Sequence, residues 1–125
     1  MEQDQGILEF AAKMGDLLVE QLGGDPKKLY ALQAWEENDA ILHGMALLYS
    51  TTGKKAYLDF CNVILLEFQM PPCGDYVRNA LAGKQYYEGS QPRWEGLHAV
   101  LGIAEMAWIT GDKYVYSKEA TLLLF

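Results

Sequence analysis

Residues 47–68 read LLYSTTGKKAYLDFCNVILLEF, and this stretch predicts two antiparallel helices joined by a tight turn. Apolar residues recur at spacings of three and four on both sides of Gly53, which is the period of an amphipathic helix. Glycine ends a helix readily because it adopts the left-handed backbone conformation that a helix C-terminus requires. We therefore expect one helix over residues 35–52 and another over residues 55–69.

A second stretch, residues 105–125, reads EMAWITGDKYVYSKEATLLLF and has the same organisation. The pairs Thr52-Gly53 and Thr110-Gly111 lie 110 − 52 = 58 residues apart, and a lysine and an aromatic residue follow each pair. Two helices per unit at this period are typical of a helical-hairpin repeat, in which each hairpin buries its apolar stripe against its neighbours. Any two helices joined by a glycine turn share part of this pattern, but the recurring residues beside the turn favour a repeat.

The remaining sequence predicts a helix over residues 6–22, a restart of helix at Asp25-Pro26 with aspartate as N-cap, and one long loop. A helix over residues 6–22 has a single apolar stripe, formed by Ile7, Phe10, Ala11, Met14, Leu17, Leu18 and Leu22. Periodicity fails over residues 70–93, and a loop of this length is usually functional or disordered. Its three tyrosines argue against disorder. We expect an all-α chain forming a single helical domain, with hairpins around residues 35–69 and 94–125.

Composition limits the classes of partner. The chain has 125 residues, of which 50% are hydrophobic, so it forms one domain at most. Its net charge of −7 disfavours nucleic acid and anionic lipid as partners. No apolar run reaches the roughly 20 residues that span a bilayer. Glu2 and Asp4 stand where a signal peptide has basic residues, which favours a cytoplasmic location.

The two cysteines, Cys61 and Cys73, do not form a metal-binding or redox motif. Cys61 falls on the apolar side of a predicted helix, where a buried thiol is the usual role. Cys73 lies in a Pro-Pro-Cys-Gly turn, where we expect it to be exposed. A disulfide between the two remains open, and one such pair is weak evidence of secretion.

Two stretches resemble a known family. They are HGMALLYSTTGKKAYLDF, residues 43–60, and CGDYVRNALAGKQYYEGSQPRWEGLHAVLGIAEMAWITGDKY, residues 73–114. Both resemble the α/α six-hairpin toroid of β-L-arabinofuranosidase-type glycoside hydrolases, and the similarity extends over about residues 35–116. The similarity is specific through the combination of both hairpins, the loop between them and RWEGLH, residues 93–98. The fold implied is an antiparallel helical-hairpin repeat, which is part of an (α/α) toroid.

The resemblance implies a zinc-bound cysteine nucleophile and a glutamate acid/base. In the family these belong to a Glu-Thr-Cys-Cys-like segment and a later cysteine pair, and this sequence contains neither. We therefore assign no catalytic residue and no metal ligand here, so zinc is expected only in a full-length relative. Two hairpins also form only part of a six-hairpin ring. Whether the chain is itself an enzyme is left open.

The loop and the helix after it supply the candidate substrate-binding residues, which are His98, Trp94, Glu95, His43, Tyr86 and Arg93. Histidine 98, early in its helix, either hydrogen-bonds a sugar hydroxyl or is satisfied by backbone groups. Histidine 43 either packs within its helix or faces a cavity. The loop aromatics either form a platform for sugar rings or fasten the loop to the helices.

Acidic residues offer no catalytic pair. Glu36, Glu37 and Asp39 occupy first-turn positions that favour the helix dipole, and we expect them to be solvated. Glu95 and Glu105 lie ten residues apart on one helix, about 15 Å along its axis, which is too far for a glycosidase acid/base pair.

Two functions remain. The first is a section of a glycoside hydrolase toroid that lines a sugar-binding cavity, with carbohydrate and the remainder of the toroid as partners. The alternative is a non-catalytic helical-repeat module that binds a protein partner or forms a homo-oligomer through its unclosed hairpin faces.

Overall fold

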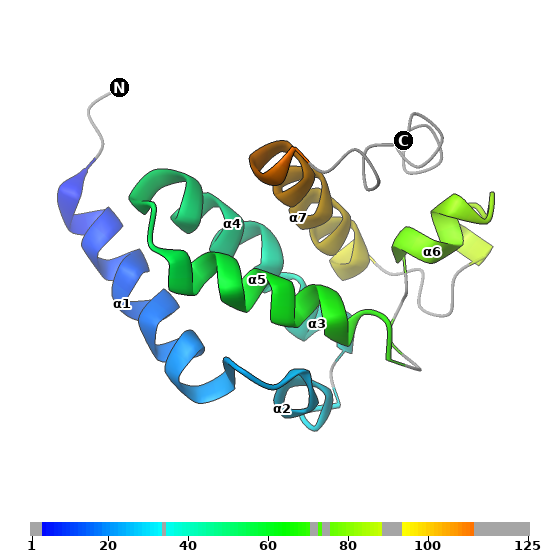
Figure 1. The fold of residues 1–125 in the computed structure, drawn as a ribbon, viewed down its shortest axis with the longest axis horizontal. Coiled ribbons are helices and arrows are strands. Elements are labelled where there is room, and N and C mark those ends of the chain that lie inside the picture. Colours follow the sequence, from blue (N-terminus) through cyan, green and yellow to red (C-terminus); the bar gives the residue numbers. More distant parts are fainter. Residues whose placement is uncertain (1–3, 34, 71–72, 74–75, 89–93, 112–125) are drawn as a thin grey trace.

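A computed structural model describes residues 4–33, 35–70, 73, 76–88 and 94–111, and it is helical throughout (Figure 1). No strand occurs in these ranges, so the all-α prediction is confirmed for them. The helices are α1 (Gln5–Leu22), α2 (Pro26–Tyr30), α3 (Trp35–Asp39), α4 (Ile41–Thr52), α5 (Lys55–Glu67), α6 (Tyr76–Leu81), the 3-10 turn η1 (Tyr86–Glu88) and α7 (Trp94–Thr110).

The two Thr-Gly turns have nearly the same local geometry. Gly53 and Gly111 have φ values of 69° and 67°, and each donates its N–H to the carbonyl four residues earlier. Thr52 Oγ1 donates to the Leu48 carbonyl at 2.6 Å, and Thr110 Oγ1 donates to the Met106 carbonyl at 2.8 Å. The helix that would follow Gly111 lies outside the described residues. The equivalence therefore holds for the turns and the helices that precede them.

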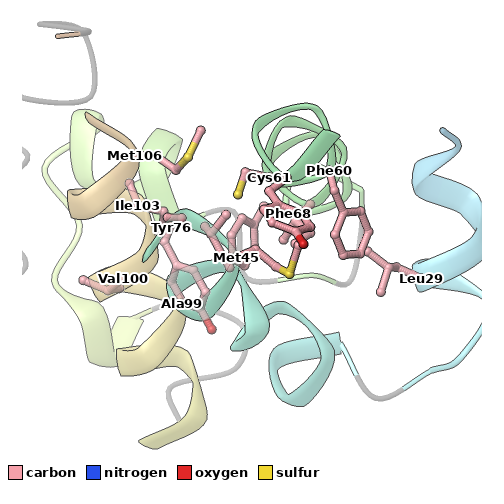
Figure 2. Close-up of a cluster of buried hydrophobic side chains, with 14 residues drawn as sticks. Leu29, Met45, Phe60, Cys61, Phe68, Tyr76, Ala99, Val100, Ile103 and Met106 are labelled. Carbon is pink, nitrogen blue, oxygen red and sulfur yellow. The ribbon is translucent and has the colours of Figure 1, made fainter. Parts of the chain in front are cut away.

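The hydrophobic core lies between α4, α5 and α7 (Figure 2). Figure 2 shows that it extends from Leu29 on α2, past Phe60 and Phe68, to Ile103 on α7. Tyr76 of α6 is buried at the α7 side of this core. The α5 stripe that the sequence predicted is thus the centre of the core.

Helix α4 and helix α7 approach each other most closely at a glycine. A Cβ atom at Gly102 would lie 2.7 Å from the backbone nitrogen of His43 and 2.7 Å from Leu42 Cγ. These distances are shorter than the sum of the van der Waals radii, so any side chain at residue 102 would clash with α4. Only glycine allows α4 and α7 to lie this close together. The absence of a side chain at residue 102 therefore sets the distance between the two helices.

The predicted helix over residues 35–52 is divided in two. Ala40 separates α3 from α4, and its ψ of −21° is closer to a 3-10 turn than to an α-helix. The predicted loop over residues 70–93 also contains structure, namely α6 and η1. The expectation of no regular structure there was wrong, because Tyr76 and Ala80 lie four residues apart and bury one side of a short helix.

Helix α1 covers only part of the stripe that its sequence indicates. Ile7, Phe10, Met14 and Leu17 are 53–68% exposed, and only Gly15 is fully buried. The helix packs against the core through Gly15, through the stripe residues Leu18 and Leu22, which are partly buried, and through Val19.

Candidate functional site

The first turns of α7 present an exposed aromatic and polar surface. The Trp94 side chain is 68% exposed, and its ring centroid lies 5.7 Å from that of His98 at an interplanar angle of 78°. This is an edge-to-face contact between residues that lie four positions apart on one helix face. His98 is also exposed. The structure therefore brings together Trp94 and His98, two of the candidate substrate-binding residues.

Glu95 lies beside this pair and is partly buried. Its Oε2 atom is inaccessible to solvent and has no hydrogen-bond partner among the residues that the structure describes. A buried carboxylate oxygen without a partner is costly, so a site of this kind calls for a donor. The carboxylate thus retains acceptor capacity at the start of α7.

Tyr86 is a packing residue. Its ring stacks on Tyr76 with centroids 5.7 Å apart and planes 23° from parallel, and Tyr76 in turn contacts Phe68 edge-on at 5.6 Å. A Cβ atom at Gly96 would lie within 2.5 Å of both tyrosine hydroxyls, so the two rings pack directly against the first turn of α7. The stack thereby fastens η1 and α6 to α7. Of the two expected roles for these aromatics, Tyr76 and Tyr86 take the structural one. Tyr87 is 74% exposed.

His43 and Arg93 are not brought into this surface. His43 lies on α4, is half-buried, and meets α7 through its backbone at Gly102. No hydrogen bond or ring contact in the described ranges joins its imidazole to Trp94 or His98. Arg93 lies outside the described residues.

A second polar cluster, formed by Asp39, Glu67 and Cys73, is buried in the core. These side chains are 1%, 0% and 5% exposed, and one ligand-type atom from each lies within 4.8 Å of the others. Cys73 Sγ lies 3.6 Å from Glu67 Oε1, to which it donates. Glu67 Oε2 is buried and has no hydrogen-bond partner among the described residues. We call these three residues the buried triad.

The buried triad corrects two expectations. Asp39 is enclosed at the end of α3 rather than solvated, and Cys73 is buried rather than exposed. Neither cysteine forms a disulfide. The sequence did contain a signal, because Glu67 follows Ile64 by three positions and therefore lies on the apolar stripe of α5. A carboxylate at a stripe position is buried with the stripe. Glu37, by contrast, is exposed as expected.

A polar contact fastens α1 to α5. The Tyr57 hydroxyl lies 2.7 Å from Asp16 Oδ1 and 3.1 Å from the Ala12 carbonyl oxygen, and Lys54 forms a salt bridge with Asp16. Hydrogen bonds from Lys54 and then Tyr57 lower the pKa of Asp16, and the bond to Asp16 raises the pKa of Lys54. Burial raises the pKa of Tyr57, as does its bond to Asp16. These residues connect helices and do not line a cleft.

Burial also determines the state of the other cysteine. The Cys61 side chain is enclosed on α5, and desolvation raises the pKa of its thiol to about 12. A thiol with this pKa is protonated and unreactive at neutral pH. The predicted role of Cys61 as a buried thiol is confirmed.

None of the described helices combines the length and apolarity that crossing a bilayer requires. No protein-family model, curated protein or solved structure matches the sequence.

Proposed function

We propose that this chain forms part of the wall of a sugar-binding cavity in a helical toroid of the glycoside hydrolase kind. The observation that carries the proposal is the exposed Trp94–His98 pair at the start of α7, with Glu95 beside it. An exposed indole face offers apolar area to the C–H face of a sugar ring. The ring nitrogens of the exposed His98 next to it can form hydrogen bonds with sugar hydroxyls, whereas the Glu95 Oε2 atom is enclosed.

The proposed role is binding and not catalysis. The catalytic segment of the resembling family has no counterpart in the sequence. The described residues at the start of α7 include one carboxylate, Glu95, whereas glycoside hydrolysis ordinarily needs two across the scissile bond. We expect the isolated chain to leave aryl arabinosides and galactosides intact. Turnover that copurifies with the chain would contradict this assignment.

Sugar binding can be measured through the indole N–H signals of the three tryptophans by two-dimensional NMR. Titration with methyl arabinofuranoside and methyl galactoside should shift the Trp94 signal, with a dissociation constant in the millimolar range, about −4 kcal/mol. Trp94→Ala should weaken binding at least tenfold. Trp108→Ala is the matched control, because Trp108 is 77% exposed near the opposite end of α7. Equal losses in both variants, or no shift at Trp94, would refute the proposal.

A second candidate function is self-association, and the apolar surface of α7 favours it. Leu97, Leu101 and Trp108 are 47%, 41% and 77% exposed on this helix. When the two Thr-Gly units are aligned at their offset of 58 residues, Leu101 of α7 takes the place of His43 of α4, because 43 + 58 = 101. The backbone of His43 is covered by another helix, since Gly102 of α7 packs against it. The equivalent surface of α7 is therefore suited to another helix of this kind, which we assign to α7 of a second copy.

Light scattering coupled to size exclusion tests the second candidate. A dimer should form at high protein concentration, and Leu101→Glu should shift it to monomer. Leu66→Glu is the control, since Leu66 is 54% exposed on α5 and lies outside the α7 surface. A monomer at all concentrations, or equal effects of both variants, would exclude self-association through α7.

A further inference from the structure

We propose that the buried triad is a Zn²⁺ site, with Cys73 Sγ and carboxylate oxygens of Glu67 and Asp39 as ligands. The inference is independent of sugar binding. Its starting point is that three groups with metal-binding atoms from α3, α5 and the segment after α5 converge in the core, each at most 5% exposed. Glu67 and Cys73 are six residues apart, whereas Asp39 is brought to them by the packing of α3 near α5.

The distances fit tetrahedral zinc. A Zn–S bond of about 2.3 Å and a Zn–O bond of about 2.0 Å at a tetrahedral angle place sulfur and oxygen roughly 3.5 Å apart. The separation between Cys73 Sγ and Glu67 Oε1 is 3.6 Å. All three ligand atoms lie within 4.8 Å of one another, so an inward shift of about 1 Å or less would complete the ligand set. A fourth position is left for water or a further donor.

Glu67 supplies the independent evidence for a missing cation. Its side chain is 0% exposed, and Oε2 has no hydrogen-bond partner among the described residues. Neither salt bridge in those ranges involves it. Burying a carboxylate oxygen without a donor or counter-charge costs far more than burying a paired one. A divalent cation at the triad would satisfy this atom and offset the charge of the Glu67 carboxylate.

The ligand chemistry selects zinc among the common divalent ions. Magnesium and calcium prefer six or more oxygen ligands, and a thiolate does not suit them. Zinc accepts sulfur and oxygen ligands together at a coordination number of four. On binding, the Cys73 thiol loses its proton to solvent as the Zn–S bond forms, so affinity should rise with pH.

The test uses the chain after chelator treatment and dialysis against limiting Zn²⁺, followed by metal analysis. We expect one equivalent of zinc per chain. Co²⁺ in place of Zn²⁺ should give a near-ultraviolet thiolate-to-metal charge-transfer band. Glu67→Gln and Cys73→Ser should weaken binding by about 10- to 100-fold or more, and Cys73→Ser should also remove the band. Cys61→Ser is the matched control, because Cys61 is equally buried but lies outside the triad.

A measurement on the unaltered chain guards against variants that fail to fold. Zinc should protect Cys73 from alkylation during mild denaturation at least tenfold more than it protects Cys61, as read by peptide mass mapping. The proposal is overturned if the chain binds no stoichiometric zinc, if the cobalt form lacks the band, or if Glu67→Gln binds as well as the original. It also fails if the two carboxyls merely share a proton, in which case Glu67→Gln stabilises the fold and zinc changes nothing.

Discussion

Helix α1 and helix α5 carry similar apolar patterns, yet one is at the edge of the molecule and the other is at its centre. Helix α5 buries Tyr57, Phe60, Cys61 and Ile64, whereas α1 buries only Gly15. Both helices contact each other and also α2 and α4, but α5 packs more extensively against α2 and α4 than α1 does, and α1 lies at the edge of the molecule in Figure 1. Spacing therefore identifies an apolar face, while the extent of packing against the neighbouring helices decides whether that face is covered.

The largest expected difference between α1 and α5 is in the reactivity of a cysteine thiol placed on each helix. Cys61 on α5 has a pKa raised to about 12, whereas a cysteine on the exposed stripe of α1 should have a pKa near the ordinary value of about 8.5. At pH 8 the thiolate fractions then differ by roughly a thousandfold. In a Leu17→Cys variant, alkylation at residue 17 should be faster than at Cys61 by at least that factor. The two alkylation rates are measured in native buffer by peptide mapping. Comparable rates would show that Cys61 on α5 is not enclosed.

Two phenylalanines allow the packing difference to be measured as stability. Phe60 is 1% exposed on α5, and Phe10 is 66% exposed on α1. Phe60→Ala should lower the free energy of unfolding by about 3–5 kcal/mol, because it leaves a cavity in the core. Phe10→Ala should change it by about 0.5 kcal/mol or less. Urea denaturation at low protein concentration gives both values. Similar costs would mean that the α1 stripe is covered in solution.

Substitutions at two glycines compare how tightly the helices pack at their contacts. A Cβ atom at Gly102 meets backbone, while one at Gly15 meets the flexible end of Leu48 at 2.8 Å. Gly102→Ala should cost about 1–3 kcal/mol, because neither helix can yield without moving its backbone. Gly15→Ala should be close to neutral, since a gain in helix propensity of about 1 kcal/mol offsets a small rearrangement. Thermal unfolding should rank the variants in this order, and the reverse ranking would contradict the geometry.

The smallest expected effect concerns pH and the polar contact that fastens α1 to α5. The pKa of Asp16 is lowered, so its contribution to stability is present above the usual value of 3.8 and is lost as pH falls through the folded-state pKa. The pKa values of Lys54 and Tyr57 are raised, so their contribution is present below pH 10 and is lost as pH rises through the folded-state values. Asp16→Asn should flatten the acid side of a urea-midpoint profile. An unchanged profile would show that the contact contributes nothing.

The fold was more predictable than its polar interior. The Thr-Gly turns, the start of α5 at Lys55 and the burial of Cys61 all followed from local pattern, because glycine, helix period and apolar spacing act over a few residues. The exposed Trp94–His98 pair was also predictable, since residues four apart share a helix face. The repeat beyond Gly111 and the toroid stay predictions.

The buried triad was not predicted, because its members come from three separate elements. Asp39 was expected near the start of a predicted helix, where a carboxylate is ordinarily solvated, but it is the last residue of α3, and Cys73 lies in a turn that would ordinarily be exposed. Their enclosure depends on α5 and on the segment after it, which no local pattern encodes. Only Glu67, at a stripe position of α5, carried a readable signal. The hydrogen bond from the Tyr57 hydroxyl to Asp16 of α1 is likewise a contact between separate elements, which the apolar spacing of α1 does not indicate.

The glycine contact between α4 and α7 has a mechanical consequence. Gly102 lies at the middle of α7, eight residues or about 12 Å from Trp94. If α7 tilts about this contact, the two ends of the helix move in opposite directions. A tilt of about 5° at residue 102 would carry the backbone at Trp94 through roughly 1 Å. The position of Trp94 thus depends on the α4–α7 contact at Gly102 as well as on the two tyrosines packed at Gly96.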